Sequence, residues 1–143
     1  MPFDALTTRE LHDVLRLRAE VFVVEQDCAY QDIDGRDPDC LHILGQAGET
    51  LIAHARVVPP ADPTSSVSIG RVVVAQAGRG TGVGRELMRV AITEATARWP
   101  GTIHVSAQAY LVEFYRSLGF EQVGPGYLED GIPHLGMDRA PPG

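Results

Sequence analysis

The feature that most constrains this chain is a strand followed by a glycine-rich turn and a helix, within residues 68–94. A β-branched run over residues 67–74 ends abruptly and is typical of a strand. The turn carries four alternating glycines, which are Gly78, Gly80, Gly82 and Gly84. From Val83 onward, apolar residues recur at helical spacing and predict a helix that ends near residue 100. This order predicts an α/β unit with an open backbone turn after its strand.

Such a turn is suited to binding an anion. The first N–H groups of a helix have no partner within the helix, and the helix dipole adds about half a positive charge there. Glycines let a phosphate approach the backbone because they carry no Cβ. The turn therefore predicts a diphosphate site, and an ordinary glycine-rich turn is the alternative.

The spacing within the turn argues against two common diphosphate motifs. A P-loop needs a Lys-Ser/Thr pair, and no lysine lies near this turn. A dinucleotide-binding turn needs G-x-G-x-x-G, whereas Gly80 and Gly82 are followed by Gly84 one position too early. The acidic residue expected about twenty positions further on is also missing. The pattern that remains is Arg79-x-x-Gly82-x-Gly84.

Composition sets the class of the protein. A length of 143 residues predicts a single domain over residues 1–143. The hydrophobic content of 44% and charged content of 22% are ordinary for a soluble globular protein. No apolar run approaches the roughly 20 residues of a membrane span, and the N-terminus does not resemble a signal peptide. Cys28 and Cys40 give no disulfide framework, so a cytoplasmic location without membrane contact is expected.

Charge and metal-ligand spacing restrict the partners. The formal net charge of −7 argues against nucleic acid and is compatible with a cationic, amine-bearing substrate. Cys40 and His42 are close in sequence, but no paired C-x-x-C or H-x-x-x-H spacing occurs. No metal cofactor is therefore expected.

The remaining segments complete an α/β order. A capping box at Thr7 and Glu10 predicts the start of a helix over residues 8–22. Gly119 is placed to end a short helix over residues 110–118. A polar segment over residues 124–132 is expected to be a loop. The expected strands besides 67–74 are 41–45 and 51–58, which form a hairpin around residues 46–49, followed by 102–107, 120–123 and 133–137.

Two motifs resemble those of the GCN5-related N-acetyltransferases, the GNAT superfamily. One is the Arg79-x-x-Gly82-x-Gly84 turn, and the other is Phe114-Tyr115-x-x-Leu118-Gly119-Phe120. Longer segments are similar to the ElaA-like branch of small bacterial GNAT proteins, and these are residues 17–26, 30–35, 55–59, 106–108 and 127–134. The resemblance covers nearly the whole chain. It implies the α/β GNAT fold, a mixed central β-sheet with splayed parallel strands flanked by helices.

The resemblance implies an acetyl-coenzyme A-dependent N-acetyltransferase that moves the acetyl group from the thioester to a primary amine by direct attack. In the superfamily, the pantetheine arm lies between the splayed strands, and the glycine turn holds the pyrophosphate. Carried over by motif, the cofactor-binding residues are Val72, Val73, Val74, Arg79, Gly80, Thr81, Gly82, Val83, Gly84, Arg85, Gln108 and Tyr115. Gln108 stands where many relatives have asparagine. Arg85 is expected to contact a phosphate, the alternative being that its side chain simply faces solvent.

The resemblance also assigns catalytic groups. Tyr115 stands at the tyrosine of the F-Y signature and is expected to protonate the leaving thiolate, the alternative being a core tyrosine. The backbone N–H near Val74 is expected to stabilise the oxyanion. The general base stays open, because residues 67–71 contain no carboxylate. The candidates are Glu25, Asp32, Asp34, Glu129 and His134, or a water chain, and Glu25 and His134 are retained with Tyr115 as catalytic residues.

The acceptor is expected to be a small or peptidic primary amine. Asp32, Asp34, Glu129 and Asp130 are expected to bind it as an acidic rim, although such residues can equally solvate a loop. A function of another class stays open, namely an acyl-coenzyme A sensor or partner-binding module with little catalysis. The identity of the amine and the oligomeric state, a homodimer included, also stay open.

Overall fold

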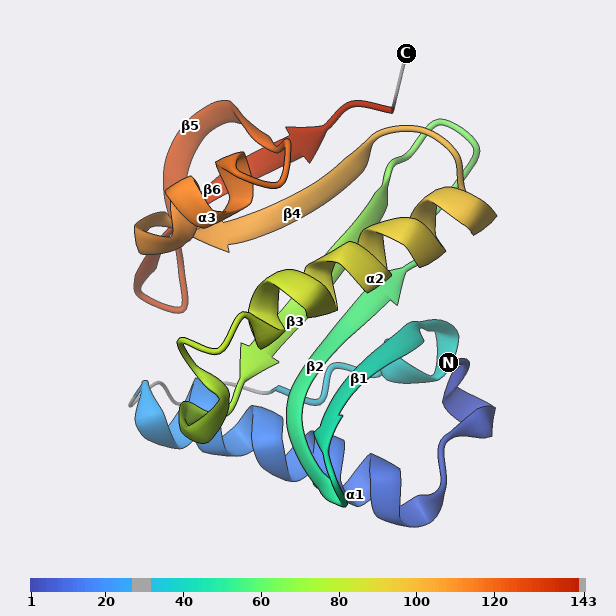
Figure 1. The fold of residues 1–143 in the computed structure, drawn as a ribbon. Helices are drawn as coiled ribbons and strands as arrows, with labels where there is room; N and C mark the ends of the chain where they lie inside the picture. The colour runs from blue at the N-terminus through green and yellow to red at the C-terminus, as the bar shows by residue number, and fades with distance from the viewer. Residues whose placement is uncertain (27–31, 142–143) are drawn as a thin grey trace.

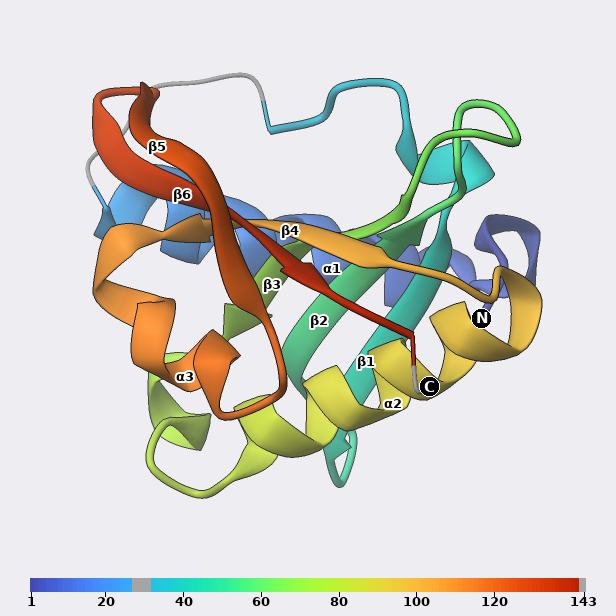
Figure 2. The same ribbon diagram turned by 90° about the horizontal axis from the view of Figure 1, so that it is seen from above.

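A computed structural model describes residues 1–26 and 32–141 of the chain. It contains a six-stranded sheet of order β1-β2-β3-β4-β6-β5, with α1 on one face and α2 and α3 on the other (Figures 1 and 2). The helices are α1 (Thr8–Arg18), α2 (Val83–Arg98) and α3 (Val112–Arg116), with a π-helix η2 (Ala19–Glu25) and short 3-10 turns η1 (Phe3–Ala5), η3 (Asp37–Asp39), η4 (Gln76–Gly78) and η5 (Ala109–Leu111). The strands are β1 (Leu41–Ala47), β2 (Thr50–Val58), β3 (Val67–Val74), β4 (Ile103–Gln108), β5 (Glu121–Glu129) and β6 (Ile132–Arg139).

The two parallel strands, β3 and β4, separate along their length. Within the described residues they pair only at Val67 with Ile103 and at Ser68 with His104. Toward their carboxyl ends they diverge, as Figure 1 shows, while β4 continues its pairing with β6. Arg71 has a φ of +48°, and the register of β3 with β2 shifts nearby. This irregularity bends β3 away from β4, because a bulge changes the direction of a strand.

Apolar residues fill both faces of the sheet. The larger cluster packs α2, through Leu87, Met88 and Ala91, against the inner strands. A smaller cluster packs the apolar face of α1 and η2 against Leu51 and Val73. The two helical layers therefore fix β3 from both sides, which determines where its carboxyl end lies.

The first helix extends further than expected. The capping box at Thr7 and Glu10 is confirmed, since each side chain accepts a hydrogen bond from the backbone N–H of the other residue. The helix does not end at residue 22 but continues as the π-helix η2 to Glu25. In its last turn, the N–H of Gln26 donates to the carbonyl of Val21 five residues earlier, at 3.1 Å.

Two other expectations about the chain need correction. Residues 124–132 are not a loop, because most of them belong to β5 and β6, which pair on both sides of an irregularity between Val123 and Tyr127. The segment is polar because β5 is an exposed edge strand. The first hairpin turns at residues 48–49 and is tighter than expected. Gly119 does end its helix, with a φ of +95°.

Candidate functional site

The glycine turn forms an open backbone cradle at the start of α2. Gly80 and Gly82 have φ values of +78° and +85°, and a Cβ at either position would meet no atom within 4 Å. Among the described residues, no side chain caps the first turn of α2, which begins after Gly82. Its first N–H groups are therefore available to an anion. Thr81 supports the turn from within, since its hydroxyl donates to the carbonyl of Gly78.

The backbone of β3 also fits an extended ligand. The N–H of Ala75 donates to the carbonyl of Ile52 in β2 at 2.7 Å, and Val74 lies opposite Ala53. In an antiparallel ladder, the N–H and C=O of Val74 must then point away from β2, toward the side where β4 has separated. A ligand with amide groups can pair with this edge as an additional strand does. The glycine turn and the strand edge together fit a molecule with a diphosphate and an amide-bearing arm.

Arg79 was expected to bind the diphosphate, but in the structure its guanidinium contacts other residues of the chain. Its Nε donates to the carbonyl of Val74 at 3.1 Å. Its two terminal nitrogens lie 2.8 and 3.0 Å from the two carboxylate oxygens of Glu25. The N–H of Arg79 donates to the carbonyl of Gln76. The cradle consequently consists of residues 80–85, and Arg79 connects the end of β3 to the end of η2.

Arg85 does not simply face solvent. Its guanidinium lies over the ring of Phe114, 5.8 Å from the centroid, and donates to the hydroxyl of Ser117 at 2.9 Å. It thereby links the first turn of α2 to α3, and Val83 and Gly84 lie in the same first turn.

Tyr115 is enclosed by other aromatic rings. It is 5% exposed and makes edge-on contacts with Phe114 and Phe120. Burial raises the pKa of Tyr115 to about 12. Its phenol is therefore neutral near pH 7 and can donate a proton.

Gln108 and His134 lie side by side on the strands next to the splay. They are partners in the β4–β6 ladder, and the Gln108 amide meets that of Gln26 at 3.3 Å. The Nδ1 of His134 lies 2.7 Å from the carbonyl of Ile132 and must donate to it, since a carbonyl only accepts. In the neutral ring the lone pair is then on Nε2, which lies 3.4 Å from a carboxylate oxygen of Glu129. The His134 ring also stacks on Tyr127.

The structure corrects the interpretation of Asp32 and Asp34 as open carboxylates. Asp32 accepts from the buried guanidinium of Arg18 at 3.0 Å. Asp34 receives two hydrogen bonds from Arg56, at 2.9 and 2.6 Å. Both carboxylates also contact Arg71. These acids balance arginines that the fold buries, whereas Glu129 and Asp130 lie at the turn between β5 and β6.

Asp37 completes this group of charges. It is buried and contacts Arg18 at 2.9 Å and Arg56 at 3.0 Å. Burial alone would raise the pKa of Asp37, but the two guanidinium groups outweigh it and hold that pKa below its usual value. Hydrogen bonds from Arg56 hold the pKa of Asp34 well below its usual range. The arginines were missed as partners because they lie 14 to 39 residues away in sequence.

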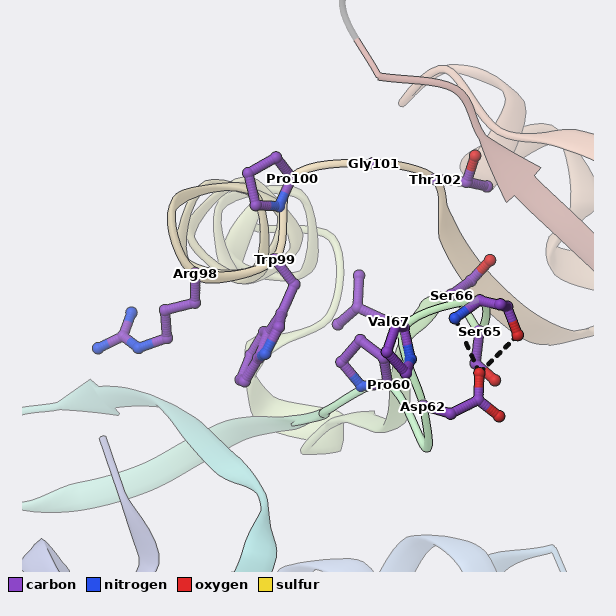
Figure 3. Close-up of a pocket in the computed structure, with 12 residues that line it drawn as sticks. Pro60, Asp62, Ser65, Ser66, Val67, Arg98, Trp99, Pro100, Gly101 and Thr102 are labelled. Atoms are coloured by element: carbon purple, nitrogen blue, oxygen red, sulfur yellow. Dashed lines mark hydrogen bonds between the residues drawn. The ribbon is translucent and has the colours of Figure 1, made fainter.

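A hollow lies at the end of the sheet opposite the glycine turn, where β3 and β4 begin. It is lined by the β2–β3 loop and the connection from α2 to β4, including Pro60, Asp62 and Trp99 (Figure 3). Asp62 is occupied by the N–H and hydroxyl of Thr64. This hollow is remote from the glycine turn and brings none of the candidate residues together.

In residues 1–26 and 32–141, no group of three or more histidine, cysteine, aspartate or glutamate side chains is arranged to hold a metal ion. None of the helices described is long and apolar enough to cross a membrane.

Comparison with known proteins agrees with this geometry. Residues 10–140 match the family described as an acetyltransferase (GNAT) domain. The chain is 47% identical over 137 residues to protein ElaA of Escherichia coli, covering 94% of this chain and 90% of that protein. The crystal structure of Escherichia coli ElaA superposes with a TM-score of 0.92, covering 97% of this chain and 95% of the other.

Two further structures extend the comparison. An acyl-CoA N-acyltransferase from Pseudomonas aeruginosa is 42% identical with a TM-score of 0.90, covering 97% of this chain and 96% of the other. An aminoglycoside 6′-N-acetyltransferase complexed with coenzyme A has a TM-score of 0.75 at 16% identity, covering 98% of this chain and 95% of the other. The second likeness concerns the fold alone. The α/β fold with its splayed parallel strands is thus the expected one.

Proposed function

Because the chain belongs to the acetyltransferase (GNAT) family and is similar to its ElaA members, we propose that it transfers an acetyl group from acetyl-coenzyme A to a primary amine. The observation that carries the proposal is the open edge of β3 beside the glycine cradle. Together they match an amide-bearing arm followed by a diphosphate. The thioester supplies an activated acetyl group, and the residues of the chain bind, orient and exchange protons.

Binding uses mainly the backbone. The N–H groups of residues 80–85 hold the diphosphate, supported by the positive end of the α2 dipole. The backbone edge of β3 at Val72 and Val74 pairs with the amides of the pantetheine arm, and the Gln108 amide adds a hydrogen bond from β4. Apolar side chains suit Val72 to Val74, since they pack in the core while their backbone binds.

Tyr115 acts as the acid. The C–S bond of the thioester breaks as the amine nitrogen bonds to the carbonyl carbon, and the leaving sulfur takes the phenol proton. A phenol whose pKa is raised to about 12 is fully protonated before this step. The N–H of Val74, which points away from β2, donates to the oxygen that becomes negative during attack.

His134 is the base in this proposal. The carbonyl of Ile132 fixes its tautomer and leaves the lone pair of Nε2 to take a proton from the amine. Glu129, 3.4 Å from that nitrogen, attracts the ammonium form of the acceptor to the same place. Glu25 does not act as the base in this mechanism, because Arg79 binds both of its carboxylate oxygens. The acceptor is thus a small or peptidic primary amine.

An assay of turnover tests the proposal. Release of coenzyme A thiol from acetyl-coenzyme A is measured with a panel of primary amines, and the acetylated product is identified by mass spectrometry. Thiol release that depends on an amine, with product gaining one acetyl group, supports a transferase. Tight binding of acetyl-coenzyme A without turnover over a broad panel would favour the alternative, a sensor or partner-binding module.

A further inference from the structure

The splayed ends of β3 and β4 lack the contacts that normally set the distance between neighbouring strands. After Ser68 and His104, the described residues of the two strands share no ladder hydrogen bonds. A cofactor arm that lies between them requires a defined separation, because hydrogen bonds lengthen and weaken over a few tenths of an ångström. Something other than sheet pairing must supply that separation.

The π-helix directs two consecutive side chains toward this region. The i to i+5 hydrogen bond from Gln26 to Val21 places Gln26 above Val21. Val21 is buried in the cluster that contains Val73 of β3, so Gln26 lies over the sheet-facing side of η2. Glu25 precedes it, and its carboxylate reaches Arg79. A regular α-helix would place Glu25 above Val21 instead.

The two side chains contact different strands. Glu25 binds Arg79 through two charged hydrogen bonds, and Arg79 donates to the terminal carbonyl of β3 at Val74. Gln26 meets the amide of Gln108, the last residue of β4. The end of η2 is thus connected to both strands at the point where they are furthest from pairing.

We propose that Glu25 and Gln26 form a clasp, meaning this pair of residues with their contacts to Arg79 and Gln108, that sets the separation of β3 and β4 for the cofactor. Both are positioning residues, and Glu25 acts through Arg79 rather than as a base. The inference rests on the proposed function, since it concerns the same cofactor site.

The clasp is expected to affect binding much more than folding. Glu25 and Arg79 are both 42% exposed, and ion pairs at that exposure contribute little to stability. Their geometric effect is larger, because small displacements of binding groups reduce affinity and rate strongly. A change in affinity without a change in thermal unfolding therefore distinguishes positioning from a general structural role.

The test compares Glu25→Gln and Gln26→Ala with a matched control, Glu94→Gln. Glu94 forms an ion pair with Arg98 at similar exposure, but at the far end of α2. Coenzyme A is titrated into each variant by calorimetry, thermal unfolding is followed, and kcat is measured against pH with the best amine. We expect Glu25→Gln to weaken binding about 10-fold, with an unchanged melting temperature and an unchanged shape of the pH profile. Glu94→Gln is expected to bind as the wild type does.

A double variant checks that Glu25 acts through Arg79. In an Arg79→Ala background, Glu25→Gln is expected to add no further loss of affinity. Three results would overturn the clasp. These are unchanged coenzyme A affinity in Glu25→Gln, additive losses of affinity in the double variant, and loss of one limb of the pH profile in Glu25→Gln. If the wild-type protein binds coenzyme A without turnover, the proposed transfer is wrong, but the coenzyme A affinities of the variants still test the clasp. Wild-type protein that binds no coenzyme A would overturn both.

Discussion

Tyr115 and His134 acquire their proposed roles from their immediate surroundings. Phe114 and Phe120 contact the Tyr115 ring edge-on, and burial keeps its phenol protonated. A backbone carbonyl fixes the His134 tautomer with its lone pair on Nε2. Tyr115 can therefore give a proton to the leaving sulfur, and His134 can take one from the amine, which are the two proton transfers that amine acetylation requires.

Removing the Tyr115 hydroxyl tests the acid. Tyr115→Phe keeps the ring that packs against Phe114 and Phe120, so folding and coenzyme A affinity should persist. We expect kcat to fall roughly 10²-fold, the lower end of general acid catalysis. Steady-state kinetics with calorimetric binding checks this. A rate equal to that of the wild type would assign the proton to water.

Changing His134 tests the base. His134→Gln keeps a polar side chain beside Glu129 but offers no lone pair of comparable basicity. We expect kcat to fall about 10²-fold while coenzyme A affinity stays unchanged. Glu129→Gln serves as a companion, for which a higher KM for the amine is expected with a smaller effect on kcat. If His134→Gln retains full turnover, the amine loses its proton to another acceptor.

At the scale of elements, local sequence patterns predicted local structure well. The glycine turn, the Thr7 capping box and the Gly119 helix end each depend on residues a few positions apart, and each is observed. The π-helix was not predicted, because the spacing of residues does not show whether a backbone N–H bonds the carbonyl four or five residues earlier. That choice determines where Glu25 and Gln26 point.

The glycine turn carries an element-scale prediction. A Cβ at Gly82 meets no atom within 4 Å, so Gly82→Asp should fold, although its φ of +85° adds some strain. Its carboxylate would stand near the diphosphate, where like charges about 4 Å apart repel by roughly 4 kcal/mol at a protein surface. We expect affinity for acetyl-coenzyme A to fall at least 100-fold.

The neutral variant Gly82→Asn is the control for that change. Asparagine has almost the same shape and tolerates a positive φ. It should lose no more than about 10-fold in affinity if charge is the cause. Equal losses in the two variants, measured by calorimetry, would show that strain in the turn and not repulsion of a diphosphate explains the effect.

At the scale of the whole molecule, the ion-pair group ties α1, β2 and β3 to residues 32–37. Three arginines meet three aspartates, and these are Arg18, Arg56 and Arg71 with Asp32, Asp34 and Asp37. The sequence showed these aspartates but not their partners, since only the folded chain brings the arginines beside them. Asp32 and Asp34, which the sequence alone suggested as a solvated or substrate-binding rim, therefore connect elements of the fold.

This group makes the free energy of unfolding depend on pH. The pKa values of Asp34 and Asp37 are lowered in the folded chain relative to 3.8, so their contribution is present above about pH 4 and is lost as the pH falls further. Asp37→Asn removes one charge that faces Arg18 and Arg56, and should lower the free energy of unfolding at pH 7 by about 3 kcal/mol. Urea denaturation at pH 7 and pH 3 measures this. A difference from the wild type that does not shrink at pH 3 would contradict the assignment.

The most direct test of the whole account is calorimetric titration of the wild-type protein with acetyl-coenzyme A, ATP and NAD. The spacing of the turn and the open edge of β3 predict saturable binding of acetyl-coenzyme A, with a Kd between about 1 μM and 1 mM, the usual range of substrate affinities. ATP and NAD, which lack an amide-bearing arm, should bind at least 10-fold more weakly. Tighter binding of either nucleotide, or no binding of acetyl-coenzyme A, would contradict the account.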